Sequence, residues 1–499
     1  MKKCLWVLLV SSLVLSSTHA LRADIPVSEA TAECMDCHNQ THPGIVQGWY
    51  NSRHAKTTPQ KAMKVEGLAN KVSSDNVPGE LREIAVGCAE CHMLRSEAHA
   101  DTFEHNGYEI HVVVSPDDCA TCHKKEKMQY AQNPMSHAYG NLASNSVYQN
   151  LERSITGTPV RTNGRIAFRP TDKGTQAETC YYCHGTQLKL AGLETRDTDL
   201  AGELEFPIIA GWPNHGVGRV NLDGSLGACS ACHARHQFSI EMARKPYTCK
   251  ECHIGPDVPA FKVYAASKHG NIFSTHQDTW IFDKVPWTIG KDFRAPTCAT
   301  CHISLLVNTE NEVVVHRTHQ MTDRLSWRLF GLVYAHPQPK DPDTTVIKNQ
   351  SGLPLPTGLD GRFASGYLID ENTQALRRQT MQSTCLNCHD AATVNKHWQQ
   401  LDNTIQKTNQ HIRVATSILE DAWKDGLADA TESLFDEVIE KKWTDIWQFY
   451  ANSIRFASAM GGGGDYAVYA GGYYQLSQTL LEMDEWLKLY QELHRQEEE

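Results

Sequence analysis

The 499-residue chain lacks three features that would place it in common protein classes. After residue 20 it has no apolar run of the ~18 residues that a membrane-spanning helix needs. It has no excess of basic residues, because 47 Lys and Arg stand against 58 Asp and Glu; the formal net charge of -11 disfavours nucleic acid as a partner. It also has no cysteine left for a disulfide, since only Cys4 of the 17 cysteines falls outside one repeated pattern.

The first 20 residues have the pattern of a signal peptide. Lys2 and Lys3 precede an apolar run over residues 5–15, and a small residue, Ala20, closes the segment. A membrane anchor is the alternative, but the apolar run is much shorter than a spanning helix. We therefore expect cleavage after Ala20 and a mature protein that is periplasmic or otherwise exported.

Sixteen cysteines form eight copies of Cys-x-x-Cys-His. Two thiols three positions apart reach the two vinyl groups of one porphyrin as thioethers, and the histidine that follows coordinates the iron. Zinc sites and redox dithiols are the alternatives for a single Cys-x-x-Cys pair. Here every pair is followed by histidine, whereas roughly 0.03 such motifs are expected by chance. The sequence therefore predicts eight haem c groups, bound by Cys34, Cys37 and His38; Cys88, Cys91 and His92; Cys119, Cys122 and His123; Cys180, Cys183 and His184; Cys229, Cys232 and His233; Cys249, Cys252 and His253; Cys298, Cys301 and His302; and Cys385, Cys388 and His389.

The second axial ligand decides what each haem can do. A haem with histidine on both faces only transfers electrons, whereas a catalytic haem keeps one face open. The chain has 25 histidines, so supply exceeds demand and counting leaves the number of open irons undetermined. Sequence context predicts seven second ligands, namely His54, His105, His137, His236, His269, His319 and His397.

The fourth motif differs from the others in this respect. Between His184 and Cys229 the only histidine is His215, which lies in a turn-rich loop. The fourth motif is therefore predicted to hold the open iron. For the second motif His105 is the choice, with His99 and His111 as alternatives.

Composition divides the chain into three segments. These are the signal peptide over 1–20, an octahaem-binding domain over 24–390 and a C-terminal helical domain over 391–499. Apolar residues at helical spacing predict three long helices near 394–426, 432–460 and 472–495, with a glycine-rich turn at 460–466. We predict a mainly α fold, with a C-terminal bundle of long helices.

Strand-like patterns are few. Residues 110–114 and 313–315 are the clearest, and residues 337–362, rich in Pro, Asp and Gly, are predicted to form a long loop.

Several segments outside the motifs form a distinctive set. They are 211–214, 216–219, 235–239, 242–246, 255–257, 267–270, 295–298 and 318–319. Together with the eight motifs and the helical C-terminal region, they resemble the octahaem hydroxylamine oxidoreductase family over nearly the whole mature chain. The resemblance implies a mostly helical homotrimer in which seven bis-histidine haems serve a fourth, open haem. It also implies a small nitrogen compound as substrate: hydroxylamine, hydrazine, nitric oxide or nitrite.

Two departures from that family concern the direction of the reaction. Oxidising members place an Asp-His pair near the open iron, and here Asp257 is followed by Val258, which cannot accept a proton. Oxidising members also carry a C-terminal tyrosine bonded to the catalytic haem. Tyr466, with Tyr469 nearby, lies close to the matching place in a setting that differs from the family pattern. We interpret the chain as a member without this cross-link that reduces nitrite or hydroxylamine towards ammonium.

The predicted catalytic residues follow from this interpretation. His184 is the proximal ligand, Asp257 orients water or donates protons, and Tyr466 hydrogen-bonds the substrate. Two alternatives stay open: oxidation of hydroxylamine or hydrazine, and a pure electron carrier with every haem closed. The redox partner is expected to be a cytochrome or a quinol-linked donor, and the acidic charge favours a basic one.

Overall fold

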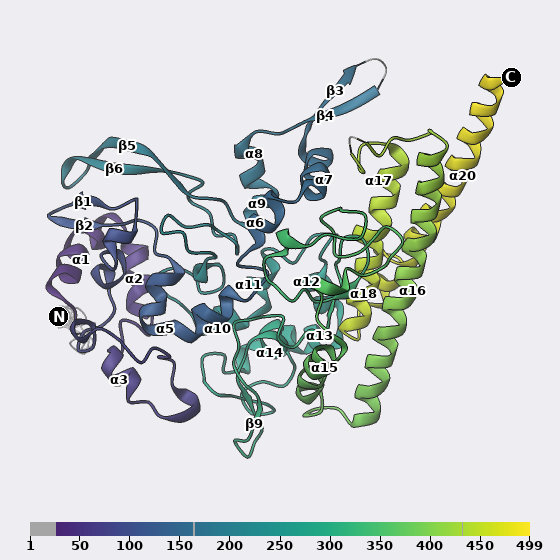
Figure 1. Cartoon of the computed structure of the whole chain (residues 1–499). Helices are drawn as coiled ribbons and strands as arrows, with labels where there is room; N and C mark the ends of the chain where they lie inside the picture. The colour runs from purple at the N-terminus through teal and green to yellow at the C-terminus, as the bar shows by residue number, and fades with distance from the viewer. Residues whose placement is uncertain (1–25, 163–164, 432) are drawn as a thin grey trace, which may run out of the picture.

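The computed structural model describes residues 26–162, 165–431 and 433–499, so the predicted signal peptide with Cys4 lies outside the described residues. About 49% of the residues are helical, which confirms the mainly α prediction. The motif-bearing part of the chain extends from the N-terminus through the centre of the molecule, and the long C-terminal helices stand together at the far end (Figure 1). No described helix combines the length and the apolar character needed to cross a membrane.

Most helices before the C-terminal bundle are short, and several coincide with a motif. Three of them, α4, α9 and α14, span the five motif residues and nothing more. The α-helices of this part are α1 (Glu29–Thr41), α2 (Pro43–Asn51), α3 (Pro59–Met63), α4 (Cys88–His92), α5 (Pro116–Ala131), α6 (Ala138–Ala143), α7 (Ser146–Thr156), α8 (Lys173–Glu178), α9 (Cys180–His184), α10 (Ile240–Arg244), α11 (Pro246–Lys250), α12 (Ala260–Ala266), α13 (Lys268–His276), α14 (Cys298–His302) and α15 (Glu371–Cys385). Short 3-10 turns are η1 (Gly67–Ala69), η2 (Gly79–Leu81), η3 (Ser96–Ala98), η4 (Cys229–Ala231), η5 (Gln277–Thr279), η6 (Thr344–Val346) and η7 (Ser365–Tyr367).

The start of α5 shows how local sequence places a motif. The Ser115 hydroxyl accepts hydrogen bonds from the backbone N–H groups of Asp117 and Asp118, while the Asp118 carboxylate accepts from the Ser115 N–H. Pro116 stands at the first helical position, where its missing N–H costs nothing. This capping box fixes the helix start at Pro116, three residues before Cys119.

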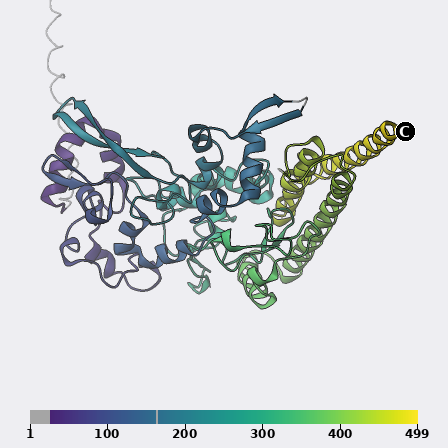
Figure 2. The ribbon, with the colours of Figure 1, turned by 45° about the horizontal axis from the view of Figure 1, so that its top comes forward.

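The strands form hairpins and one small three-stranded sheet. They are β1 (Phe103–His105), β2 (Tyr108–Ile110), β3 (Thr158–Thr162), β4 (Arg165–Arg169), β5 (Lys189–Thr198), β6 (Gly202–Ala210), β7 (Trp287–Thr288), β8 (Leu306–Val307), β9 (Val313–Val315), β10 (Trp327–Arg328) and β11 (His336–Pro337). The pairs β1–β2, β3–β4, β5–β6 and β10–β11 are antiparallel, and β8 lies between β7 and β9. The β3–β4 and β5–β6 ribbons project from the body in both views (Figures 1 and 2).

The strand predictions had mixed outcomes. The strand over 313–315 is confirmed as β9, and residues 338–362 are irregular apart from η6. The strand over 110–114 was wrong beyond Ile110, where β2 ends. The N–H groups of Val112 and Val113 both donate to the Asp101 carboxylate at 2.9 Å, so they have no hydrogen bonds left for a neighbouring strand.

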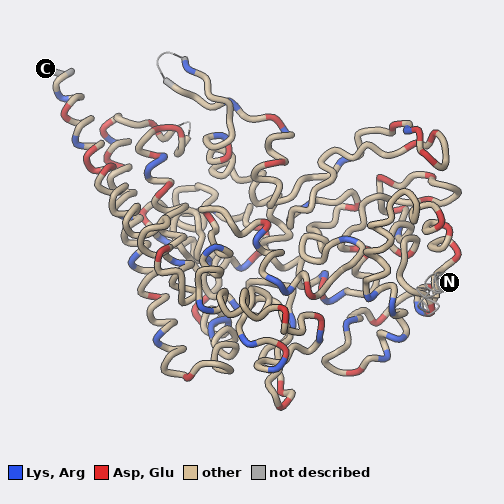
Figure 3. Tube along the Cα trace, turned by 180° about the vertical axis from the view of Figure 1, so that it is seen from behind, with Lys and Arg blue, Asp and Glu red and all other residues tan. Residues whose placement is uncertain are grey.

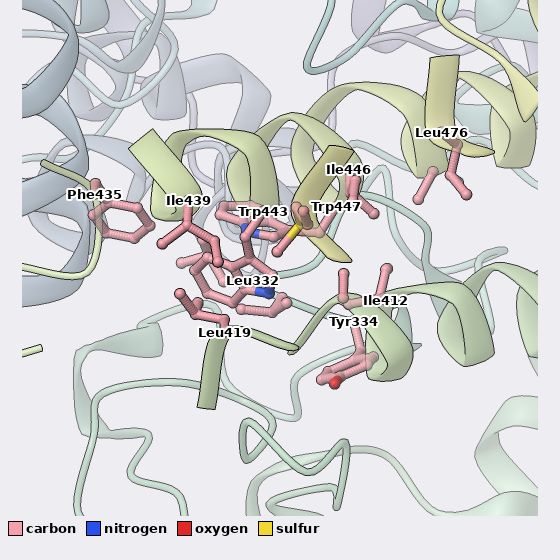
Figure 4. Packing of buried hydrophobic residues seen from close by; sticks show 14 of the residues in the cluster. Leu332, Tyr334, Ile412, Leu419, Phe435, Ile439, Trp443, Ile446, Trp447 and Leu476 are labelled. Carbon is pink, nitrogen blue, oxygen red and sulfur yellow. The ribbon is translucent and has the colours of Figure 1, made fainter. Parts of the chain in front are cut away.

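The predicted C-terminal helices are confirmed. They are α16 (Ala391–Lys424), then α17 (Val438–Thr444), the π-helical turn η8 (Asp445–Tyr450) and α18 (Ala451–Ala459), then α20 (Tyr473–Glu498). The glycine-rich turn holds the five-residue α19 (Gly464–Val468). Figure 4 shows the core between these helices, where Trp443 and Trp447 pack edge to face beside Phe435.

Charged residues also enter this core. Glu440 is fully buried and accepts hydrogen bonds from the Trp423 indole and from the N–H groups of Asp436 and Glu437. Burial, opposed by these hydrogen bonds, raises the pKa of Glu440 to about 7.

Candidate functional site

None of the sixteen motif cysteines forms a disulfide, so each can form a thioether bond. Fourteen are half-buried, and only Cys37 in the first motif and Cys388 in the eighth are exposed. In a helical turn, residues three apart share a face, so each motif presents two thiols and one imidazole to the same space.

Thiols of different motifs lie side by side. The Cys119 thiol interacts directly with that of Cys229, which brings the third motif next to the fifth. Cys183 interacts with Cys252, and Cys249 with Cys298, so the sixth motif adjoins both the fourth and the seventh. Weaker electrostatic contacts join Cys34 to Cys88, Cys91 to Cys122, Cys232 to Cys249 and Cys301 to Cys385. The motifs therefore form one continuous series, with the fourth motif attached to it through the sixth.

Four motif histidines face one of the predicted second ligands at a nearly constant separation, and a fifth, His92, has the ring of His111 at 6.1 Å. The ring centroids are 6.2 Å apart for His38 and His105, 6.3 Å for His123 and His54, 6.5 Å for His233 and His319, and 6.1 Å for His389 and His269. A metal–imidazole bond of about 2 Å on each side of one iron would put two ring centroids about 6 Å apart. These residues therefore fit a bis-histidine haem.

The electrostatics of the candidate second ligands agree with this geometry. Burial first, and then the charge of His123, lowers the pKa of His54 to about 4. Burial and then His233 lower the pKa of His319 to about 3, and burial and then His92 lower the pKa of His236 to about 4. Each ring is thus neutral at pH 7, as an iron ligand must be.

Several motif histidines also use the ring nitrogen that iron does not need. The Nδ1 atoms of His92, His123 and His302 lie 2.8, 3.0 and 3.2 Å from backbone carbonyls of His111, Lys71 and Met321. A donated Nδ1–H fixes the tautomer and leaves Nε2 as the ligand atom.

The pairs join residues that are far apart in the sequence. His105, predicted for the second motif, lies beside His38 of the first. His54, which follows the first motif, lies beside His123 of the third, and His236, which follows the fifth, has its pKa lowered in part by His92 of the second.

Three predicted ligands and three motif histidines are not paired in this way, and His236 is linked to His92 only electrostatically. His397 lies near His389 and His269, and His137 has its Nε2 3.1 Å from the Ala131 carbonyl. Among the described residues, no ring contact joins His184, His253 or His302 to a second histidine.

The alternatives His99 and His111 stack on each other with ring centroids 3.6 Å apart. The Nε2 of His99 lies 3.1 Å from the Asp118 carboxylate, and its Nδ1 lies 3.7 Å from that of Asp101. Burial alone would lower the pKa of His99, but the hydrogen bonds with Asp101 and Asp118 outweigh it and raise the pKa to about 9. A protonated imidazole cannot bind iron, so His99 has a structural role. Burial lowers the pKa of His111 instead, and its Nδ1 and Nε2 lie 3.2 and 3.0 Å from the carbonyls of Val113 and Leu94.

The fourth motif is held by a tightly packed loop. Gly185 follows His184 with φ +90°, and a Cβ at Gly185 would lie 2.3 Å from the Arg219 nitrogen. The N–H of Val217 donates to the Cys183 carbonyl at 3.0 Å, and Asn214 donates to the Tyr181 carbonyl at 3.2 Å. Glycine at this position therefore lets the 214–219 loop pack against α9 and fix His184.

Successive residues of α18 hold the other predicted catalytic residues. Asn452 donates to the Asp257 carbonyl at 2.8 Å, and the Ser453 hydroxyl donates to the Tyr466 carbonyl at 2.9 Å. Val258 and Tyr466 pack in one apolar cluster around Phe456. The structure thus brings the Asp257 loop and the Tyr466 turn together, although they are more than two hundred residues apart in sequence. Tyr469 instead is 63% exposed and contacts Tyr474.

Charges from two directions reach the fourth motif. Burial lowers the pKa of His184, a backbone hydrogen bond with Ala138 and the charge of Asp257 oppose this, and Arg328 adds to it. Asp257 acts in the same way on His253, whose pKa burial also lowers. Asp257 therefore lies between the fourth and sixth motifs, with Arg328 on the side of the fourth.

Sequence reasoning missed three residues of this region, Arg328, His336 and Arg455. His336 is fully buried, and burial first, then Arg328 and Arg455, lowers its pKa to about 3. Arg455 is also fully buried and donates to Thr408, Asn409, Asn452 and the Leu329 carbonyl. No local sequence signal marks them, because the β10–β11 pairing and the helix packing that bring them together are long-range contacts.

Family comparisons match most of the motif-bearing part. Residues 199–327 match a family described as multi-haem cytochrome with seven CxxCH motifs. Residues 33–110 and 118–202 match the family of cytochrome c554 and c-prime. A solved structure described as a hypothetical multiheme protein is 39% identical, with a TM-score of 0.88, over 94% of this chain and 97% of that one.

More distant relatives carry functional descriptions. A probable nitrite reductase-hydroxylamine oxidoreductase fusion protein of Kuenenia stuttgartiensis is 26% identical over 291 residues, which is 54% of this chain but only 25% of that protein. A reducing HAO-like protein complex from the same organism has a TM-score of 0.61 at 17% identity, covering 94% of this chain and 87% of that one, and shows a shared fold.

Proposed function

Because this chain belongs to the multihaem cytochrome c family, we propose that it is an oxidoreductase that binds eight haem c groups and reduces nitrite or hydroxylamine towards ammonium at the fourth motif. The observation that carries the proposal is the meeting of the Asp257 loop and the Tyr466 turn on α18, within electrostatic reach of His184. The descriptions of the Kuenenia relatives agree with chemistry on nitrogen compounds.

The eight motifs would hold the haems through their paired thiols and their histidines, as the sequence predicts. When bound, haem supplies one-electron redox chemistry and, where an axial position stays open, a site for a small ligand. The four histidine pairs, and His236 beside His92, support closed electron-transfer roles for the first, second, third, fifth and eighth motifs. No described contact joins His137 or His397 to the sixth or seventh motif, so their roles as second ligands remain predictions from the sequence.

Three residues of the chain have different roles at the fourth motif. His184 is the proximal ligand, held by the loop that packs on Gly185. Asp257, whose backbone α18 fixes, orients water and passes protons to the substrate. Tyr466 offers its hydroxyl as a hydrogen-bond donor, and the apolar neighbours Val258, Phe330 and Phe456 limit access of water.

The direction follows from the proton balance of the reaction. Oxidation of hydroxylamine releases protons at each step and needs a base beside Asp257, where Val258 offers none. Reduction to ammonium consumes protons, which a carboxyl group in contact with water can supply repeatedly.

Two assays on the haem-loaded protein test the proposal. Reduced protein should bind carbon monoxide at one haem, and reduced viologen should support turnover of nitrite or hydroxylamine. Turnover only with oxidised cytochrome c as acceptor would show hydroxylamine or hydrazine oxidation instead. Failure to bind carbon monoxide would show an electron carrier with all haems closed. A Tyr466→Phe variant with an unchanged ferrous spectrum is expected if no cross-link exists.

We also propose export and a homotrimer, as the family resemblance implies. The projecting ribbons and the last helix expose apolar side chains that a monomer rarely leaves in water, among them Ile166, Leu193, Leu200, Leu481 and Leu489. Light scattering of the purified protein tests the trimer, and N-terminal sequencing of the exported protein tests cleavage after Ala20.

The redox partner is expected to be basic, such as a small cytochrome, with a quinol-linked donor as the alternative. Asp and Glu gather on the outer side of the N-terminal lobe along β5–β6 and α1 (Figure 3), close to the exposed Cys37 of the first motif. Electron transfer from a basic partner should slow as ionic strength rises.

A further inference from the structure

We propose that Arg328 binds the anionic substrate of the fourth-motif site and makes the site selective for nitrite over neutral nitrogen compounds. This inference rests on the proposed function and adds a residue and a substrate class to it.

The fold holds Arg328 in place on a short hairpin. Arg328 ends β10 and pairs with His336 of β11, and the Gln338 side chain donates to the Trp327 carbonyl at 2.9 Å. The Arg328 guanidinium lies over the Phe330 ring, 5.1 Å from its centroid. Phe330 in turn stacks on Phe456 at 6.1 Å.

Phe330 connects this hairpin to the predicted catalytic residues. It packs in the same apolar cluster as Val258, Phe456 and Tyr466. The Arg328 backbone is therefore part of the frame that positions the Asp257 loop, and its side chain stands against an apolar wall. A charge beside such a wall is poorly screened by water, which strengthens its attraction for an anion.

The guanidinium has hydrogen-bonding capacity that the described chain does not use. An arginine side chain has five N–H donors, yet the Arg328 guanidinium forms no hydrogen bond or ion pair within residues 26–162, 165–431 and 433–499. The neighbouring Arg324 differs, because its donors reach the carbonyls of Thr300, Cys301, Ser304 and His316 at 2.6–3.1 Å. Arg324 has a structural role, whereas Arg328 keeps its donors for another group.

The negative charge of the site, the Asp257 carboxylate, is also not paired with Arg328. The Asp257 carboxylate forms no ion pair with Arg328 in the described part of the chain, although Val258, the residue after Asp257, packs in the same apolar cluster as Phe330, over which Arg328 lies. Asp257 is held through its backbone carbonyl, which leaves its carboxylate available. The carboxylate and the guanidinium therefore both keep hydrogen-bonding capacity beside the cluster that contains Val258 and Phe330.

Nitrite suits this arrangement better than hydroxylamine does. Its two oxygens share one negative charge, much like a carboxylate, and the planar guanidinium fork binds such a group through two parallel hydrogen bonds. Hydroxylamine is neutral at pH 7 and gains little from a nearby cation. Asp257, on the other side, can then deliver protons to the bound anion.

The test compares Arg328→Gln and Arg328→Lys with the unmodified haem-loaded protein. Nitrite binding is followed by spectral titration with sodium nitrite, and carbon monoxide and hydroxylamine serve as neutral ligands. We expect Arg328→Gln to weaken nitrite binding about 10- to 100-fold, the effect of losing a hydrogen bond to a charged group, and to leave carbon monoxide binding unchanged. Arg328→Lys should recover part of the loss, because it keeps the charge but not the fork.

Arg362→Gln is the matched control, since Arg362 is an exposed arginine paired with Asp360 outside the site. Haem content and far-UV circular dichroism establish that each variant is folded, and Arg328→Lys provides the measurement if Arg328→Gln is not. Unchanged nitrite affinity in both variants overturns the inference, even if a haem potential shifts, because that result indicates a propionate partner. Failure of the unmodified protein to bind nitrite or carbon monoxide would instead overturn the proposed function.

Discussion

The C-terminal bundle and the motif-bearing part are stabilised in different ways. In the bundle, long helices bury a continuous core of side chains that includes Trp443, Ile412 and Leu476. The motif-bearing part instead contains several small clusters, one of which has only Val113, Leu188 and Ile209 as buried members. Between these clusters lie the thiols and imidazoles of the motifs. The comparison indicates that side chains complete one core and covalently attached haem completes the other.

The largest expected effect comes from preventing haem attachment. Without haem, the motif-bearing part loses the apolar groups that fill its interior, so we expect it to unfold while the bundle helices persist. Limited proteolysis of protein made without haem maturation should therefore cut first within residues 26–330. The haem-loaded protein, digested in parallel, is the control, and equal resistance of the two forms would contradict the comparison.

The next effect concerns the side-chain core of the bundle. Trp443 is fully buried and its indole N–H donates to Thr416 at 3.0 Å. Trp443→Ala should lower the free energy of unfolding by about 3–5 kcal/mol through the cavity it leaves. Val414→Ala on the exposed side of α16 should change it by less than about 0.5 kcal/mol. Chemical denaturation of the haem-loaded proteins measures both, and similar losses would show that the bundle lacks a continuous core.

The sequence predicted the bundle better than the motif-bearing part, because side-chain patterns along the chain determine the bundle helices. The bundle helices follow from local apolar spacing, and α16, α18 and α20 lie where that spacing placed them. The β5–β6 ribbon was missed because most of its side chains are exposed and β5 shows no regular apolar and polar alternation. In β6 the sequence alternates only over residues 203–206, which is too short a run to predict a strand of nine residues.

The motifs themselves were readable, but the partners of their histidines were not. His319 lies beside His233, and His269 beside His389, through folding that joins distant segments. Distance along the chain therefore does not identify the second ligand. The position of Arg328 was equally hidden, because it depends on the pairing of β10 with β11.

A smaller effect is the pH dependence of the stability of the bundle, which contains the buried Glu440. The pKa of Glu440 rises from 4.5 to about 7 on folding, chiefly through burial. A raised folded pKa means that stability is full below pH 4.5 and falls as pH rises towards 7, by up to about 1.4 kcal/mol per pH unit. Glu440→Gln should remove this slope, because the amide stays neutral. Unfolding measured from pH 4 to pH 8 tests this, and an equal slope in both proteins would be the contrary result.

The smallest effect concerns a single helix start in the motif-bearing part. Ser115 caps α5, the helix that carries the third motif, and its hydroxyl also donates to Asp223 at 2.6 Å. Ser115→Ala should destabilise the haem-loaded protein by about 1 kcal/mol, the usual cost of a lost N-cap. Ser417→Ala on the exposed side of α16 is the control, because its hydroxyl bonds only the Val414 carbonyl of the same helix. If thioether bonds to Cys119 and Cys122 hold the start of α5 on their own, Ser115→Ala will match that control, and local capping will matter less in this part than covalent attachment.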